Sequence, residues 1–124
     1  MPLNVDSSQK RPGAFVIRCD GALDSNTYSI LENTVARILA QRPEAIIFDM
    51  EKLGYISSAG IRVILKANRS IKASGGNVHL MRLQPQIRKV FEIIQALPTL
   101  TVFTSIQEMD HYLDAMQSRV LDGE

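Results

Sequence analysis

The hydrophobic pattern changes most sharply around the middle of the chain. Residues 45–48 (Ala-Ile-Ile-Phe) form a continuous apolar run, which is typical of a strand buried on both faces. After Ser57-Ser58-Ala59-Gly60 the apolar positions recur every three or four residues, at Ile61, Ile64 and Leu65, and this period predicts a helix. The sequence therefore predicts a parallel strand over 45–50 and a helix from about Ser58 to Ala73.

The same alternation of strand and helix patterns continues along the whole chain. Strands are expected at 3–5, 15–19, 78–83 and 101–103, and further helices after Asn26, from Pro85 and from Ser105. The short spacing of the first two strands predicts a hairpin. We therefore expect an α/β fold: one domain over residues 1–124, with its core at about 3–118. Its mostly parallel five-stranded sheet has an N-terminal antiparallel edge strand and four helices.

Composition excludes several functional classes. The net charge of +1 gives no overall field that would attract nucleic acid, and no apolar run approaches the length of a membrane span. The single cysteine, Cys19, rules out an internal disulfide and fits a reducing compartment. His79, His111 and Cys19 are scattered, so no metal cluster is expected. The prediction is a soluble cytoplasmic protein without a metal.

Ser57 and Ser58 stand where the central helix is expected to begin. A helix start offers unpaired backbone N–H groups and the positive end of the helix dipole, so one of these serines can serve only as an N-cap. The same position also suits a phosphate group. The pattern alone leaves both interpretations open.

Catalytic alternatives find little support around these serines. A nucleophile elbow needs glycine two positions before the serine, whereas Tyr55 and Ile56 occupy those positions. His79 alternates with Met81 and Leu83 in a predicted strand, so it is interpreted as a packed histidine rather than a base. Neither GxxxxGKS nor GxGxxG occurs in the sequence. A small serine hydrolase or a nucleotide-binding protein therefore ranks low.

Two further features flank the serines. Asp49 ends the predicted strand and is expected to organise the loop by accepting backbone hydrogen bonds from the 53–57 connection. Arg62, Lys66 and Arg69 recur at helical spacing after Ser58 and form a basic stripe. Such a stripe is usually only a solvated face, but its closeness to the serines makes it a candidate for contact with an acidic partner.

The chain resembles the STAS domain family, to which the bacterial anti-sigma factor antagonists belong. The resemblance covers nearly the whole length and is strongest in Asp49-x-x-x-Leu53-x-Tyr55-Ile56-Ser57-Ser58-Ala59-Gly60. Residues 21–24 (Gly-Ala-Leu-Asp), Gly75-Gly76 and the segment 90–92 (Val-Phe-Glu) also look like the family. One departure stands out: Ser57 occupies the place of the motif aspartate, and Ala59 that of the next hydroxyl residue.

The resemblance implies a non-catalytic cytoplasmic binding module without a cofactor. Such proteins bind an anti-sigma factor that is often also a serine kinase, and thereby release a sigma factor. The kinase phosphorylates a serine two residues before the motif glycine, which is Ser58 here, and a serine phosphatase reverses the reaction. Without the motif aspartate, Ser57 is an alternative acceptor. The expected partner surface comprises Ser57, Ser58, Ala59, Gly60, Arg62, Lys66 and Arg69. Gly60 is expected to let a partner's backbone approach, and the turn near Gln84-Pro85 is expected to border this surface.

A second hypothesis keeps the family but removes the switch. The chain would then be an unphosphorylated STAS subunit of a signalling or lipid-transport assembly. The two hypotheses differ in one observation, since only the first predicts phosphoserine at Ser58 or Ser57.

Overall fold

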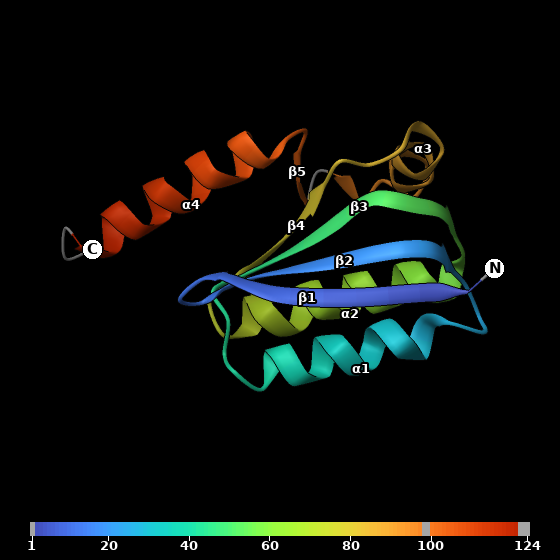
Figure 1. Cartoon of the computed structure of the whole chain (residues 1–124), viewed down its shortest axis with the longest axis horizontal. Coiled ribbons are helices and arrows are strands. Elements are labelled where there is room, and N and C mark those ends of the chain that lie inside the picture. The colour runs from blue at the N-terminus through green and yellow to red at the C-terminus, as the bar shows by residue number, and fades with distance from the viewer. Residues whose placement is uncertain (1, 98–99, 122–124) are drawn as a thin grey trace.

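The computed structural model describes residues 2–97 and 100–121, without the side chains of 117–121. Strands and helices alternate along these residues (Figure 1). The elements, in chain order, are β1 (Leu3–Arg11), β2 (Ala14–Leu23), α1 (Tyr28–Leu39), β3 (Ala45–Ile56), α2 (Ser58–Ala73), β4 (Asn77–Met81), α3 (Pro85–Ile93), β5 (Thr101–Phe103) and α4 (Ile106–Leu121).

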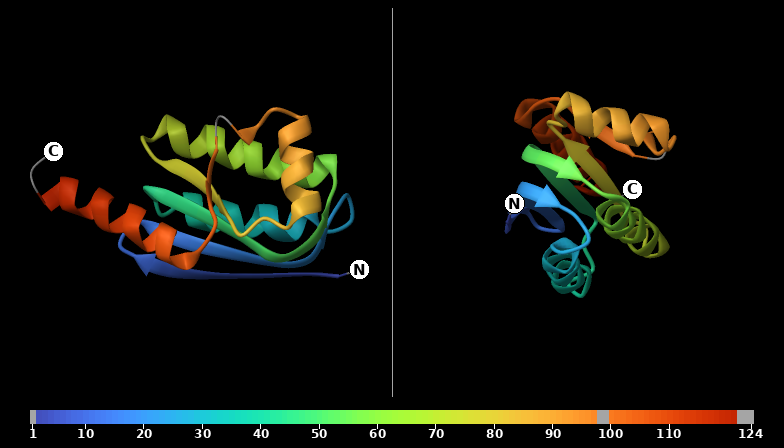
Figure 2. Two further views of the ribbon diagram at one scale, coloured as in Figure 1. Left: turned by 90° about the horizontal axis from the view of Figure 1, so that it is seen from above. Right: turned by 90° about the vertical axis from the view of Figure 1, so that its right-hand side faces the viewer.

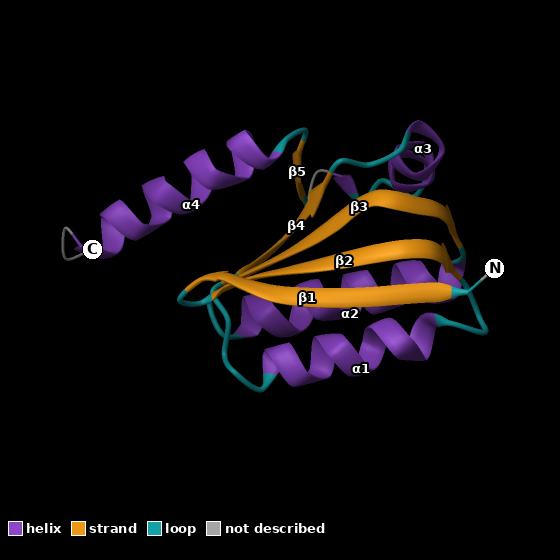
Figure 3. Cartoon of the chain, in the orientation of Figure 1, coloured by secondary structure: helices purple, strands orange, loops and turns teal. Residues whose placement is uncertain are grey.

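The five strands form one sheet in the order β1-β2-β3-β4-β5. β1 runs antiparallel to β2, and all other neighbours are parallel. Helices α1 and α2 cover one face of the sheet, whereas α4 lies on the other face (Figure 3). This arrangement confirms the α/β fold with an antiparallel N-terminal edge strand that the sequence predicted.

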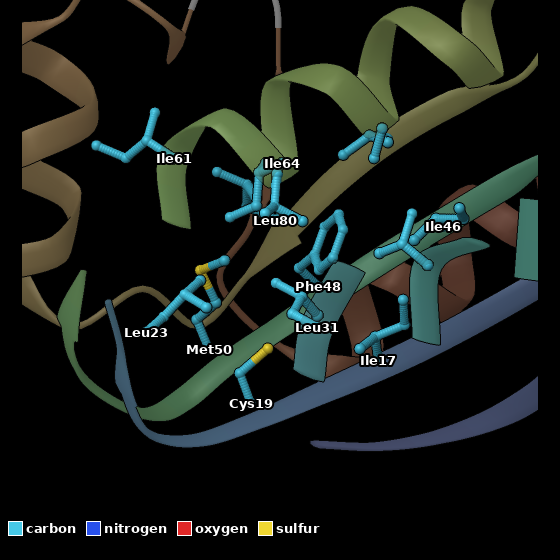
Figure 4. Close-up of a cluster of buried hydrophobic side chains, with 14 of the residues drawn as sticks. Ile17, Cys19, Leu23, Leu31, Ile46, Phe48, Met50, Ile61, Ile64 and Leu80 are labelled. Atoms are coloured by element: carbon cyan, nitrogen blue, oxygen red, sulfur yellow. The ribbon is translucent and has the colours of Figure 1, made fainter. Parts of the chain in front are cut away.

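The larger core cluster lies between the sheet and α1 and α2. Figure 4 shows part of it, with apolar side chains from β2, β3, β4 and both helices gathered in one layer. Ile17, Phe48 and Ile64 are fully buried there. A smaller cluster, which includes Ile47, Met81 and Leu113, joins α4 to the opposite face. Burial of this apolar surface on both sides of β3 explains why its sequence is a continuous apolar run.

Two strands extend well beyond the ends predicted from hydrophobicity. β1 continues to Arg11 through polar residues, because an edge strand with a solvated face needs no apolar alternation. β3 continues from Met50 to Ile56 because it remains paired with β2, where Leu23 lies opposite Ile56. The register shifts twice along this pair, each time with one more residue on β3 than on β2. The predicted connection at 53–56 is therefore strand.

Other boundaries agree with the sequence or differ by a few residues. α2 spans Ser58–Ala73 as predicted. β4 ends at Met81 rather than at residue 83, because Arg82 takes a left-handed backbone conformation with φ 56°. The apolar spacing of the sequence predicts Ile94 on the inner face of the helix that starts at Pro85, but α3 ends at Ile93 and Ile94 is 43% exposed. The sequence also predicts that this helix ends before Pro98, a residue that lies outside the described residues.

Candidate functional site around Ser58

Ser57 is the N-cap of α2, and its side chain takes part in that role. Its backbone is extended, and its hydroxyl oxygen accepts a hydrogen bond from the Gly60 N–H at 3.4 Å. The Ser57 N–H donates to the Leu23 carbonyl at 2.9 Å, which fixes the end of β3 against the end of β2. Half-buried and engaged in the cap, Ser57 is the less available of the two serines.

Ser58 is the first residue of α2, and its side chain is exposed. Its neighbours Ala59 and Gly60 are buried in the fold of the chain itself. A Cβ atom at Gly60 would lie 2.5 Å from Leu23 Cγ, so glycine is needed for packing against Leu23. This corrects the expectation that Gly60 gives room to a partner's backbone. The exposed part of the predicted surface is Ser58 and the residues that follow on α2.

The basic stripe of α2 faces solvent as expected. Arg62, Lys66, Arg69 and Lys72 are all exposed, while the opposite side of the helix is buried. Tyr55, three residues before Ser58, is 55% exposed at the end of β3. Tyr55 was not among the predicted site residues, although the sequence places this aromatic residue two positions before Ser57. The site therefore combines a hydroxyl, an aromatic ring and a row of cations.

Asp49 does not organise the 53–57 connection. Its side chain is 5% exposed and pairs with Arg82 at the end of β4. Arg82 Nε lies 3.2 Å from Oδ1 and Nη2 lies 2.5 Å from Oδ2, a two-pronged contact. Oδ1 also accepts from the Glu51 N–H at 3.2 Å. The hydrogen bonds that Arg82 donates to Asp49 raise the pKa of the Arg82 guanidinium, which stays charged.

The start of α3 is attached to the strand that leads to Ser58. Gln84, the N-cap residue of α3, donates through Nε2 to the Glu51 carbonyl at 2.8 Å. Gln86 Nε2 donates to the Gly54 carbonyl at 3.3 Å and to Gln84 Oε1 at 2.7 Å. The predicted turn at Gln84-Pro85 thus borders the end of β3, as the sequence analysis expected.

A second polar region lies on the α4 side of the sheet, over the part that α4 does not cover. It is a shallow groove of about 300 Å³. Its lining includes Asp6, Arg18, Asp20, Asp49, Lys52 and Arg82. Arg18 is paired with Asp6 at 2.6 Å, and Arg82 with Asp49. Both arginines therefore already have carboxylate partners within the chain.

Neither histidine is placed to act as a base for the serines. His79 is buried on the α4 side of the sheet, where its ring lies 5.1 Å from that of Phe103 and 4.6 Å from that of Tyr112. This confirms the prediction of a packed histidine. His111 is exposed on α4. Within the described residues, no group of three or more His, Cys, Asp or Glu side chains has an arrangement that would hold a metal ion.

Comparison with known proteins decides the family. The STAS domain matches residues 7–109, which is most of the chain. The chain belongs to the STAS domain family. A Bordetella bronchiseptica relative, provisionally named anti-sigma factor antagonist BtrV, is 32% identical over 93 residues, which are 75% of this chain and 78% of the relative. The sequence-based prediction of the family is thereby confirmed.

Solved structures of STAS proteins share the fold. The anti-sigma factor antagonist SpoIIAA in its unphosphorylated form superimposes with a TM-score of 0.73 at 22% identity, covering 92% of this chain and 98% of SpoIIAA. The Bacillus cell fate determinant SpoIIAA in its phosphorylated form gives a TM-score of 0.72 at 24% identity, covering 88% and 99%. Among the described residues, no helix is both long and apolar enough to cross a membrane.

Proposed function

We propose that this STAS domain is an anti-sigma factor antagonist that binds its partner around Ser58 and releases it when Ser58 is phosphorylated. The observation that carries the proposal is the exposure of Ser58 at the first position of α2, beside a serine already engaged in the cap. The relatives named anti-sigma factor antagonist support the class of partner. The domain acts by binding, and we assign it no catalytic residue.

Charge explains how one phosphate would control the complex. The exposed row of Arg62, Lys66 and Arg69 favours a partner surface that carries acidic groups. A phosphate on Ser58 adds a charge of about −1.5 to −2 at the start of this row. The helix dipole stabilises that charge within the domain itself. Across the interface, repulsion of several kcal/mol would weaken binding by orders of magnitude, since about 1.4 kcal/mol changes affinity tenfold.

A kinase and a phosphatase are part of the proposal. We infer that a serine kinase, which is the anti-sigma factor itself or acts beside it in the cytoplasm, modifies Ser58. A phosphatase restores the free hydroxyl. Ser57 departs from the acidic residue of the family motif, so the kinase would have to select Ser58 by its exposure and by the neighbouring cations and Tyr55.

The experiment begins with affinity purification of the full chain from its own cells, followed by mass spectrometry of the bound proteins and of the serines. The anti-sigma factor found is then titrated against the wild-type protein, Ser58→Ala and Ser58→Asp. We expect Ser58→Ala to bind like the wild type, and Ser58→Asp to bind at least about tenfold more weakly.

Gln107 provides a control on the other face of the sheet. It is an exposed residue in the first turn of α4, so Gln107→Glu adds a negative charge at the same kind of helix position away from α2. The affinity of this control variant for the anti-sigma factor should equal that of the wild type. Equal affinity of Ser58→Asp and Ser58→Ala would reject the switch, and a co-purifying complex without phosphoserine would instead indicate a constitutive STAS subunit.

A further inference from the structure

The outer edge of β1 is the longest open edge of the sheet. β1 has nine residues and a single neighbour, β2, whereas the opposite edge strand, β5, has only three residues. Figure 2 shows β1 at the rim of the sheet, with no other described element beyond it. An edge strand of this length presents a row of N–H and C=O groups ready to pair with another strand.

The alternation of hydrogen bonds between β1 and β2 shows which residues of β1 direct their backbone N–H and C=O groups away from the sheet. The Ala22 N–H donates to the Pro2 carbonyl at 3.4 Å, so this is a hydrogen-bonded pair of the antiparallel ladder. Such pairs alternate with non-hydrogen-bonded ones along the strands. In the register of β1 with β2, Asn4, Asp6 and Ser8 therefore bond to β2. Their odd-numbered neighbours, among them Val5 and Ser7, direct their backbone groups away from the sheet.

Charges on β1 are arranged so that the strand is complementary to itself. Asp6 and Lys10 both point to the α4 side of the sheet, since Asp6 pairs with Arg18 and Lys10 Nζ lies 3.5 Å from Asp110 Oδ1. β1 carries a bulge at Lys10, since its register with β2 shifts between Gln9 and Arg11. If two β1 strands pair antiparallel with Ser8 at the centre, counting along the chain places Asp6 of each copy opposite the partner's Lys10, at this bulge. Opposite charges at facing positions favour this pairing.

Only a few registers bring the outward backbone groups of two β1 strands together, because over residues 3–9, before the bulge, the pairing residues must both be odd-numbered. A centre on Ser7 leaves Asp6 opposite the partner's Ser8, without a countercharge. The next register, shifted further toward the N-terminus, places Asp6 opposite the partner's Asp6, and like charges repel there. The charges therefore favour the register centred on Ser8.

We propose that β1 is a homodimer interface, in which two copies of the chain pair their β1 strands antiparallel around Ser8 and join their sheets. Along one side of the seam the charges would alternate as Arg18, Asp6, the partner's Lys10 and the partner's Asp110. These ion pairs are exposed and individually weak, so the backbone ladder supplies most of the affinity and the charges set the register.

This interface is separate from the site around Ser58. α2 begins after β3, and in the sheet β2 lies between β3 and β1. The right-hand view of Figure 2 places α2 and β1 on different sides of the molecule. A dimer formed through β1 would thus carry two Ser58 sites, so its failure to form and a failure of the phosphoserine switch are independent results.

The first test measures molecular mass by sedimentation equilibrium over a concentration series. Ser7→Pro removes an outward N–H group while leaving the ladder to β2 intact, and proline is tolerated on such an edge. We expect the wild type and the control Ser7→Ala to reach the dimer mass, and Ser7→Pro to remain a monomer with an unchanged circular dichroism spectrum. A wild type that is monomeric up to the order of 1 mM, or a dimer that survives Ser7→Pro, overturns the proposal.

The second test identifies the register by charge exchange. Asp6→Lys alone places lysine opposite the partner's Lys10, and Lys10→Glu alone places glutamate opposite the partner's Asp6. Each variant should dimerise about tenfold more weakly than the wild type. In an equal mixture, the mixed dimer recovers both opposite-charge contacts, so its affinity should return to the wild-type value. A mixture that associates no more tightly than either variant alone overturns pairing around Ser8.

Discussion

The guanidinium of Arg82 donates two hydrogen bonds to the carboxylate of Asp49, which stands 33 residues earlier in the chain. The contact joins the end of β4 to the middle of β3 on the α4 side of the sheet. Arg82 itself has a left-handed backbone conformation, with φ 56°, directly before the segment that leads into α3. Asp49 therefore links β3 to the end of β4 and to the loop that follows β4.

Loss of Arg82 should leave a buried carboxylate without its countercharge. We expect Arg82→Leu to lower the free energy of unfolding by about 3 kcal/mol, and Arg82→Lys to lower it less, because lysine keeps the charge but not the two-pronged geometry. Urea unfolding gives the measurement. Arg88→Leu, which removes an exposed pair with Glu92, serves as the control and should change stability by less than about 0.5 kcal/mol. Equal effects at Arg82 and Arg88 would contradict this interpretation.

Gly60 should tolerate no side chain. In Gly60→Ala the new methyl group would meet Leu23 Cγ at 2.5 Å and Leu23 Cδ2 at 2.9 Å, so the start of α2 or Leu23 must move. We expect a loss of about 1–3 kcal/mol in the free energy of unfolding. Gly54→Ala is the matched control, since the nearest atom to its methyl group is the Gly21 carbonyl oxygen at 4.0 Å. The prediction fails if both variants unfold at the same urea concentration.

His79 should make stability depend on pH in the acid range. Burial lowers the pKa of His79 from 6.5 to about 4, so the folded state holds this ring neutral while the unfolded chain binds a proton below pH 6.5. The contribution of the neutral His79 ring to the free energy of unfolding is complete above pH 6.5 and is lost as the pH falls toward 4. The total loss is about 3 kcal/mol.

The measurement is urea unfolding at a series of pH values from about 7 to about 4, a range that spans the pKa of His79 in the unfolded chain and in the folded state. His79→Phe keeps an aromatic ring against Phe103 and Tyr112 but carries no proton. The difference in stability between wild type and His79→Phe should therefore shift in favour of the variant as the pH falls. A difference that stays constant with pH would show that His79 does not titrate on unfolding.

Cys19 should be unreactive in the folded protein. It is 1% exposed, and burial raises the pKa of its thiol to about 12, so almost no thiolate is present at neutral pH. We expect thiol reagents to modify it only at the rate at which the domain opens, and promptly in urea. Rapid labelling of the native wild type would contradict the packing of β2 described above. The destabilised Gly60→Ala variant should label faster.

The sequence was informative where local pattern decides structure. The change of period at Ser58 predicted a helix from about Ser58 to Ala73, which is where α2 lies, because apolar spacing and capping residues act within a few positions. The extension of β3 to Ile56 was missed, since Glu51, Lys52 and Tyr55 are exposed there and only pairing with β2 keeps the segment extended.

Contacts between residues far apart in the chain were the other feature that the sequence did not predict. Asp49 looked like a loop residue because Arg82 lies far away in sequence and no local pattern links the two. Gly60 was assigned to a partner's approach because the sequence does not show that Leu23 packs against it. The serines and the basic stripe were selected by type and spacing, and the structure separates the capping serine from the exposed one.

The clamped first turn of α2 has a consequence for any regulation at this position. The Ser57 hydroxyl is bonded inside the turn and Gly60 packs against Leu23, so the residues on both sides of Ser58 are held in place by the fold. A modifying enzyme would then alter the local potential of an otherwise unchanged surface. A partner would then respond to the changed charge when the two proteins first meet, and no slow conformational change of the STAS domain would be required.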